Sequence, residues 1–136
     1  FPGEGQAAFD NTCNLVDALP LAYLHVFPFS ARPGTPAFHF RDQLPDQTIK
    51  ARTAKLRKLG KQKKRAFIEA NMGRRHRVLI EGQRDRQTGF LKGLTANYIP
   101  TLIEGDDDLM NRIVIVEPQT ILPEGRIKGD ISSLAS

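Results

Sequence analysis

Three side chains that could bind a ligand follow a continuous apolar run early in the chain. The run covers residues 21–29, and Ser30, Arg32 and Thr35 come directly after it, within a segment that ends in Pro-Gly-Thr-Pro. A run of this length predicts a strand covered on both faces, as in a parallel α/β sheet. Ligands gather at the carboxyl ends of such strands. Taken alone, however, the residues favour the simpler interpretation, in which the prolines and the glycine only fix a loop.

The elements before this run predict how it is held. Residues 5–19 place Phe9, Cys13 and Val16 at helical spacing, so we expect a short amphipathic helix after the Pro2-Gly3 turn. Turn, helix and strand together indicate a βαβ unit that lacks its first strand, and residues 1–43 are therefore predicted to be one slice of a larger sheet. Cys13 is expected to be a small buried hydrophobic residue. A single cysteine excludes an internal disulfide framework and a cysteine-ligated metal or iron-sulfur site built from this chain alone.

A strongly basic segment follows at residues 44–73, with nine basic and two acidic side chains. It contains no proline after Pro45, which predicts one long helix ending near Gly73. Ile49, Leu56, Leu59, Phe67 and Ala70 share one arc of this helix. The opposite arc is a candidate for binding phosphates, such as those of RNA, and carries Lys50, Arg57, Lys58, Lys61, Lys64 and Arg65. Phosphate contact would relieve the repulsion along this face, and simple solvation is an equal alternative.

From residue 74 onward the pattern changes to short strands bounded by Gly, Asp and Asn. Segments 76–82, 89–105 and 111–118 are expected to be strands, with 125–131 as a weaker or edge strand. This predicts a small antiparallel barrel of the OB kind over residues 74–136. Such barrels bind looped RNA, and the candidate contacts are Arg77, Lys92, Asn97, Tyr98 and Arg112. Tyr98 could equally belong to the core, and Asp106 to Asp108 are expected to form a turn.

Composition limits where the protein acts. No apolar run approaches the roughly 20 residues of a membrane span, and we expect a cytoplasmic protein with no membrane partner. The chain begins at Phe1 without an initiator methionine or a charged leader, so we interpret it as a piece of a longer protein.

Four motifs occur in an order that strongly resembles the C-terminal portion of the radical SAM tRNA methylthiotransferases, the MtaB/MiaB-like family. They are FPGEG, LHVFPFSARPGTPAF, GLTANYIPTLIEG and NRIVIV. Two residues depart from the family pattern, with Gly5 in place of Thr and Phe29 in place of Tyr. The lead-in at Leu24–Phe27 is most similar to the MtaB branch, whose substrate is threonylcarbamoyl-adenosine beside the anticodon.

This resemblance implies a fold in three parts. They are an α/β fragment at 1–43, the last helix and strand of a radical SAM β/α partial barrel, a connecting basic helix at 44–73, and a TRAM, OB-like barrel at 74–136. It also implies that the parent enzyme uses S-adenosylmethionine and two 4Fe-4S clusters. The cluster cysteines would precede Phe1, so this chain is expected to contain no catalytic or metal-binding residues and to be inactive alone.

The resemblance further assigns a place near the cofactor or the target nucleotide to Pro2, Gly3, Glu4, Ser30, Arg32 and Thr35. The expected partner is tRNA at its anticodon stem-loop. The alternatives are a non-catalytic RNA-binding barrel with a basic helical arm, and an interaction module for an acidic protein. An incomplete sheet would also expose a strand edge, so self-association through residues 1–43 is a further expectation.

Overall fold

The computed structural model describes residues 1–135, so Ser136, the last residue of the predicted barrel segment, lies outside it. The chain divides into two compact units, residues 1–64 and the part from residue 65 onward. The helices are α1 (Gln6–Ala18), η1 (Pro36–His39), α2 (Asp46–Asn71), η2 (Asp107–Leu109) and η3 (Pro123–Gly125). The strands are β1 (His76–Arg84), β2 (Leu91–Thr95), β3 (Pro100–Ile103), β4 (Ile113–Leu122) and β5 (Arg126–Leu134).

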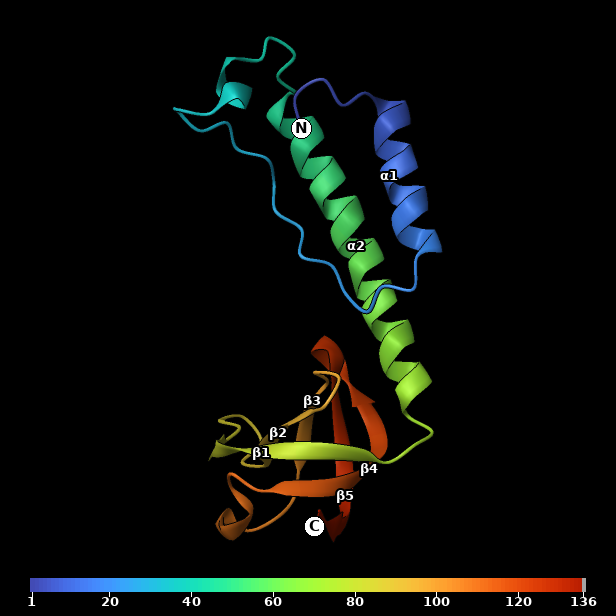
Figure 1. The fold of residues 1–136 in the computed structure, drawn as a ribbon, viewed down its shortest axis with the longest axis vertical. Helices are drawn as coiled ribbons and strands as arrows, with labels where there is room; N and C mark the ends of the chain where they lie inside the picture. The colour runs from blue at the N-terminus through green and yellow to red at the C-terminus, as the bar shows by residue number, and fades with distance from the viewer. Residues whose placement is uncertain (136) are drawn as a thin grey trace. The chain divides into compact units, whose positions relative to one another are not determined.

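In the first unit, α1 and the first part of α2 lie side by side (Figure 1). Phe9 and Cys13 are buried, which confirms the amphipathic helix and the buried position of the cysteine. The guanidinium of Arg52 lies 5.0 Å from the centre of the Phe9 ring, a cation-π contact. The ammonium of Lys63 donates to the carbonyl of Asp17, and also to that of Leu19 at 2.8 Å. These bonds satisfy carbonyls at the C-terminal end of α1 that the helix itself leaves unpaired.

The predicted strand at residues 21–29 is wrong. This segment has no regular secondary structure and runs along α2 in an extended path (Figure 1). Phe27 is 80% exposed, far from the burial expected of a central strand. A parallel strand needs a neighbouring strand for its backbone hydrogen bonds, and the only sheet among residues 1–135 is formed by β1 to β5. The apolar run therefore has nothing to pair with in the described part of the chain.

The long basic helix is confirmed as α2, which continues without interruption through Gly60. Glycine in mid-helix costs about 1 kcal/mol relative to alanine. A packing contact explains its presence, because a Cβ atom at Gly60 would lie 3.3 Å from the Cβ of Leu24. Val26, two residues further on, accepts a hydrogen bond from Arg57 at 3.3 Å. Gly60 and Arg57 thus hold the extended segment close to the helix.

The second unit contains a closed five-stranded barrel in the order β1-β2-β3-β5-β4. The prediction of a wholly antiparallel barrel is wrong in one pair, because β3 and β5 run parallel. Segment 125–131, predicted to be a weak or edge strand, belongs to β5, which pairs with both β3 and β4. Inserting β5 between these strands closes the sheet and leaves no free edge.

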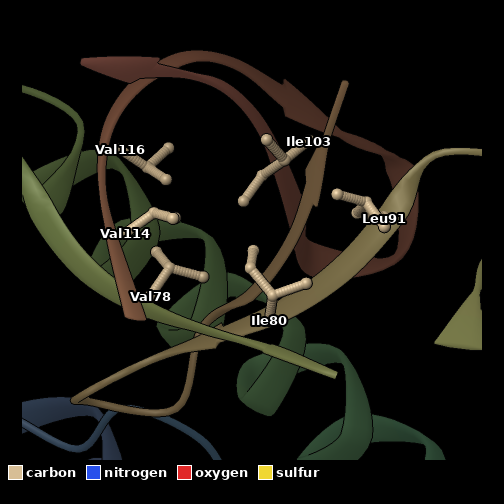
Figure 2. Close-up of a cluster of buried hydrophobic side chains, with 6 residues drawn as sticks. All are labelled: Val78, Ile80, Leu91, Ile103, Val114 and Val116. Atoms are coloured by element: carbon tan, nitrogen blue, oxygen red, sulfur yellow. The ribbon is translucent and has the colours of Figure 1, made fainter. Parts of the chain in front are cut away.

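Alternate residues of the strands point into the barrel and form its main core (Figure 2). Six of these side chains are fully buried: Val78, Ile80, Leu91, Ile103, Val114 and Val116. Two inward positions are glycines, Gly93 and Gly129, where strands pass too close for a side chain. A Cβ atom at either glycine would lie 2.5 Å from a valine methyl group, of Val78 for Gly93 and of Val116 for Gly129.

The last part of α2 belongs to this second unit and supplies a second apolar cluster. Ile68 is buried with Ile99 and Ile127, and the half-buried Phe67, Met72 and Ile121 pack around them. Next to this cluster, the side-chain oxygen of the buried Asn71 accepts hydrogen bonds from Arg74 at 2.7 Å and Asn97 at 3.1 Å. The end of the helix is therefore joined to the barrel by both apolar packing and a polar network.

Asp85 organises the turn between β1 and β2. Its carboxylate accepts hydrogen bonds from the hydroxyl of Thr88 at 2.8 Å, the amide of Thr88 at 2.9 Å and the guanidinium of Arg126 at 3.1 Å. The Thr88 hydroxyl first, then the Thr88 amide and the Arg126 charge, hold the pKa of Asp85 below its ordinary value of 3.8, since each favours the charged form.

We expect this carboxylate to make barrel stability depend on pH. A carboxyl group whose pKa is lower in the folded than in the unfolded state stabilises the fold at pH values above its ordinary pKa of 3.8. This stabilisation is lost as the pH falls through the pKa of the folded state. Thermal unfolding of wild type and Asp85→Asn, followed by circular dichroism between about pH 2 and pH 6, should show a weaker pH dependence for the variant. Asp108→Asn, at an exposed carboxyl, serves as control and should behave like wild type. An equally steep decline in Asp85→Asn would contradict this role.

Candidate nucleic-acid interface

Four of the predicted basic residues gather along one groove on the first unit. The groove has a volume of about 500 Å³. Lys50, Arg57, Lys58 and Lys61 line it together with Pro28, Thr53 and Ala54. No acidic side chain is among these lining residues. Lys64 and Arg65, predicted to lie on the same face, do not line it.

The other basic residues of α2 have partners within the protein. Arg52 donates to the carbonyl of Glu4 at 2.6 Å, and Lys55 lies 4.0 Å from Asp10. Lys63 binds the end of α1, and Arg65 forms an ion pair with Glu69 at 2.8 Å. In contrast, Lys50, Lys58 and Lys61 have no such partner among the residues that the structure describes. The groove therefore collects three lysines that α2 does not use for its own packing, together with Arg57, which bonds the carbonyl of Val26.

A second basic surface lies on the outside of the barrel. Arg77 and Arg112 line a shallow pocket of about 320 Å³ with Ile113, Leu134 and Ala135. Neither arginine has an ion-pair partner in the described part of the chain. Ile113 and Leu134 are 41% and 57% exposed, so the surface combines charge with apolar area. The sequence analysis did not single out these apolar residues, although Ile113 alternates with the inward Val114 and could have been read as an outward residue.

The turn between β2 and β3 places the two other predicted contacts differently. Tyr98 is 72% exposed and adopts a φ of +66°, which resolves the question of whether it belongs to the core. Asn97 is half-buried, and its amide is bonded to Thr95 at 2.6 Å and to Asn71 at 3.1 Å. Asn97 therefore shapes the turn, and the ring of Tyr98 is the group that the turn presents to solvent.

Lys92, unlike Arg77 and Arg112, has an ion-pair partner. Its ammonium lies 3.4 Å from the carboxylate of Glu81 on the neighbouring strand, and both side chains are partly exposed. An exposed pair of this kind contributes at most about 1 kcal/mol, so an RNA phosphate could replace the carboxylate at small cost.

The two turns that the resemblance placed near the cofactor or the target nucleotide begin next to each other in the structure. The ring of Phe1, next to Pro2, lies 5.4 Å from the ring of Phe29, next to Ser30. Gly3 donates to the carbonyl of Asp42 at 2.8 Å and has a φ of +80°, a conformation that favours glycine.

The second of these turns is shaped by its own residues. Gly34 has a φ of +86°, and the hydroxyl of Thr35 donates to the carbonyl of Arg32 at 2.7 Å. Pro33 followed by a glycine with positive φ fits a type II turn. Ser30 and Arg32 are exposed, whereas the hydroxyl of Thr35 is occupied by the turn itself.

These residues do not fit the iron-sulfur clusters that the resemblance implies. Such clusters need several cysteine thiolates, and the chain has one cysteine, Cys13, buried in α1. Among residues 1–135, no three His, Cys, Asp or Glu side chains are grouped so that they could hold a metal ion. The cavity at Phe1 and Glu4 measures about 140 Å³, below the range of roughly 300–1,000 Å³ typical of cofactor sites.

No helix in the described residues is long and apolar enough to cross a membrane.

Comparison with known proteins gives these surfaces a context. No protein-family model matches the chain. The chain is similar to tRNA methylthiotransferases. It is 34% identical over 98% of its length to the tRNA-2-methylthio-N(6)-dimethylallyladenosine synthase of Xanthomonas campestris, and 33% identical over 85% to that of Pelotomaculum thermopropionicum. It is also 33% identical over 77% of its length to the threonylcarbamoyladenosine tRNA methylthiotransferase MtaB of Aquifex aeolicus. The chain spans only about a quarter of the length of these methylthiotransferases, 24% to 28%.

Proposed function

We propose that this chain is the C-terminal, RNA-binding part of a tRNA-modifying methylthiotransferase. The observation that carries the proposal is the similarity to these enzymes over 77% to 98% of the chain. A closed five-stranded barrel with unpaired arginines and an exposed tyrosine supports it, since small barrels of this kind bind RNA with basic and aromatic side chains. In this proposal the barrel is the TRAM domain of the parent enzyme, and the bound element is the anticodon stem-loop.

Different side chains have different roles in this proposal. Arg77 and Arg112 contact phosphates, and Lys92 joins them by exchanging its Glu81 partner for a phosphate. Tyr98 stacks on an unpaired base, and Asn97 fixes the turn that presents it. The cluster chemistry comes from other parts of the parent enzyme, because this chain lacks the cysteines that it requires.

The two turns of the first unit form part of the wall around the cofactor or the target nucleotide. The side chains and backbone groups proposed for this wall are those of Pro2, Gly3, Glu4, Ser30, Arg32 and Thr35. The contact between the Phe1 and Phe29 rings supports their acting together, because it brings the two turns to one place. S-adenosylmethionine, when bound by the whole enzyme, supplies the radical chemistry.

The modified adenosine is the part of the proposal on which the relatives divide. The lead-in at Leu24–Phe27 favours threonylcarbamoyl-adenosine. The relatives named for dimethylallyladenosine, however, match at 33% to 34% identity over 85% to 98% of the chain, and the one named for threonylcarbamoyladenosine matches at 33% over 77%. Nucleoside analysis of cellular tRNA distinguishes the two substrates.

Deleting the gene of the full-length protein should remove one methylthiolated adenosine from the cell's tRNA. Mass spectrometry of hydrolysed tRNA identifies which one is lost, and the nucleoside without the methylthio group should accumulate. The complete gene should restore the modification, and a gene truncated before Arg65 should not. Unchanged amounts of both methylthiolated adenosines after the deletion would sink the proposal.

Tyr98→Ala should weaken binding of an anticodon stem-loop RNA, because stacking on one base contributes about 1–3 kcal/mol, roughly 5- to 150-fold in affinity. Fluorescence anisotropy with the complete 136-residue chain measures this change. Tyr98→Phe keeps the ring and the Cβ atom at the positive φ, so it should bind like wild type. Equal affinity of all three proteins would remove Tyr98 from the interface.

A further inference from the structure

The unpartnered lysines of α2 lie on one side of the helix. At about 100° per residue, Lys50 and Lys61 lie about 20° apart around the helix, and Lys58 lies within about 80° of both. At a rise of 1.5 Å per residue, the row from Lys50 to Lys61 is about 16 Å long. Phosphates on one strand of a duplex recur every ~3.4 Å along the axis, so the row can face several of them.

Arg57 completes this row in a different way. Its guanidinium is held by the carbonyl of Val26 at 3.3 Å, and it lines the groove together with the three lysines. The remaining lining residues are Thr53 and Ala54 of α2, which have small side chains, and Pro28 of the extended segment. Four of the seven lining residues are therefore basic, so the positive charge belongs to the groove rather than to a single lysine.

We propose that this groove is a second RNA contact of the chain and that it binds the phosphodiester backbone without reading bases. The proposal rests on the proposed function, because RNA is the polyanion that this function supplies. Arg57 and Lys61 are one helical turn apart, as are Lys58 and Lys61, so like charges repel along the row. Phosphates placed in the groove remove this repulsion and release counterions. The proposal confines the contact to Lys50, Arg57, Lys58 and Lys61 and excludes Lys64 and Arg65.

Lys58→Gln and Lys61→Gln test the groove, each alone and as a double variant. Each neutralised phosphate contributes about −0.7 to −0.9 to the slope of log affinity against log salt. Each substitution should therefore reduce the slope by about 0.7 to 0.9 and weaken binding about 5- to 8-fold near 0.1 M salt. The measurement is anisotropy of a labelled anticodon stem-loop with the complete chain at several salt concentrations.

Lys55→Gln is the matched control, because Lys55 also lies on α2 and is exposed but faces Asp10 outside the groove. It should leave the slope unchanged, and circular dichroism should show the same helix content in every variant. If Lys58→Gln and Lys61→Gln behave like Lys55→Gln while Tyr98→Ala still weakens binding, the groove proposal falls and the proposed function stands.

Two further outcomes separate the possible ligands. If the wild-type chain does not bind the stem-loop at all, the proposed function and the groove fall together. A labelled polyglutamate peptide tests an acidic protein as the occupant. If the double variant loses affinity for this peptide but not for RNA, the groove belongs to a protein partner and the RNA assignment is overturned.

Discussion

Gly93→Ala should destabilise the barrel, although it adds only one methyl group. The new Cβ atom would lie 2.5 Å from a methyl carbon of Val78 and 3.0 Å from the carbonyl oxygen of Leu79. Both neighbours belong to β1, which pairs with β2 at this position, so relief requires the strands to move apart. Overpacking of this kind costs about 1–3 kcal/mol. Thermal unfolding should show a midpoint lower by about 4–8 °C for each kcal/mol, since the barrel unit is small.

Gly82→Ala provides the control within the same barrel. Gly82 lies in β1, and a Cβ atom there would meet only the side-chain amide of Asn111, at 3.6 Å and 3.7 Å, which is ordinary contact. We expect its unfolding midpoint to stay near that of wild type. A similar midpoint for Gly93→Ala and Gly82→Ala would show that the barrel can widen at β2, and the close approach would then not explain the glycine.

The helices were predictable because their signals are local. The spacing of Phe9 and Cys13 gave α1, and the absence of proline after Pro45 gave α2. Alternation of apolar residues also located the strands of the barrel, except that the predicted segment 89–105 is divided by a turn into β2 and β3. The parallel pairing of β3 with β5 did not follow from it, since pairing depends on residues distant in sequence and alternation carries no direction.

The predicted strand at residues 21–29 shows a different limit. An apolar run reports only that side chains can be buried, whereas a strand also needs a neighbour for its backbone. The described chain offers none, and the segment packs against α2 at Leu24. Sequence pattern therefore identified a segment suited to a sheet without showing that the sheet is present.

The sequence predicted that the candidate site is basic, but not which of its basic residues line the groove. Helical periodicity placed six cations on one face of α2, and four of them line the groove. Which cations remain unpaired depends on the geometry of their acidic neighbours, such as Glu69 on the same helix for Arg65 and Glu81 on the neighbouring strand for Lys92. Asn97 was likewise singled out by its motif, and the structure uses its amide to hold the turn beside Asn71.

Helix α2 also illustrates why one arc cannot describe a long helix. The sequence analysis placed Phe67 and Ala70 on the same apolar arc as Ile49. In the part of α2 that belongs to the second unit, however, the fully buried apolar side chain is that of Ile68. Its neighbours there are Ile99 and Ile127 of the barrel, whereas the first part of the helix packs against α1 and the extended segment. Burial follows the local partner, so the buried face shifts when the partner changes.

Ile68→Ala should consequently destabilise the barrel unit, although Ile68 lies in a helix and not in a strand. Its side chain is 1% exposed and packs with Ile99 and Ile127, so truncation leaves a cavity in that cluster. Substitutions of buried isoleucine by alanine cost about 2–5 kcal/mol, a large part of the roughly 5–15 kcal/mol that stabilises a typical domain. Urea unfolding, followed by the far-UV circular dichroism signal of the β-strands, should show a lower midpoint concentration of urea. The dependence of the unfolding free energy on urea concentration should stay unchanged.

Two neighbours on the helix make this result specific. Ile68→Val removes one methylene group and should cost about 0.5–1.5 kcal/mol, giving a graded series. Glu69→Ala breaks only the exposed ion pair with Arg65, so it should change the free energy of unfolding by less than about 1 kcal/mol. If Ile68→Ala unfolds like Glu69→Ala, the helix end is an appendage of the barrel. If it unfolds in proportion to the lost volume, residues from Arg65 onward are part of the barrel's own core, and a barrel that starts at residue 74 would lack the side chain that fills this cluster.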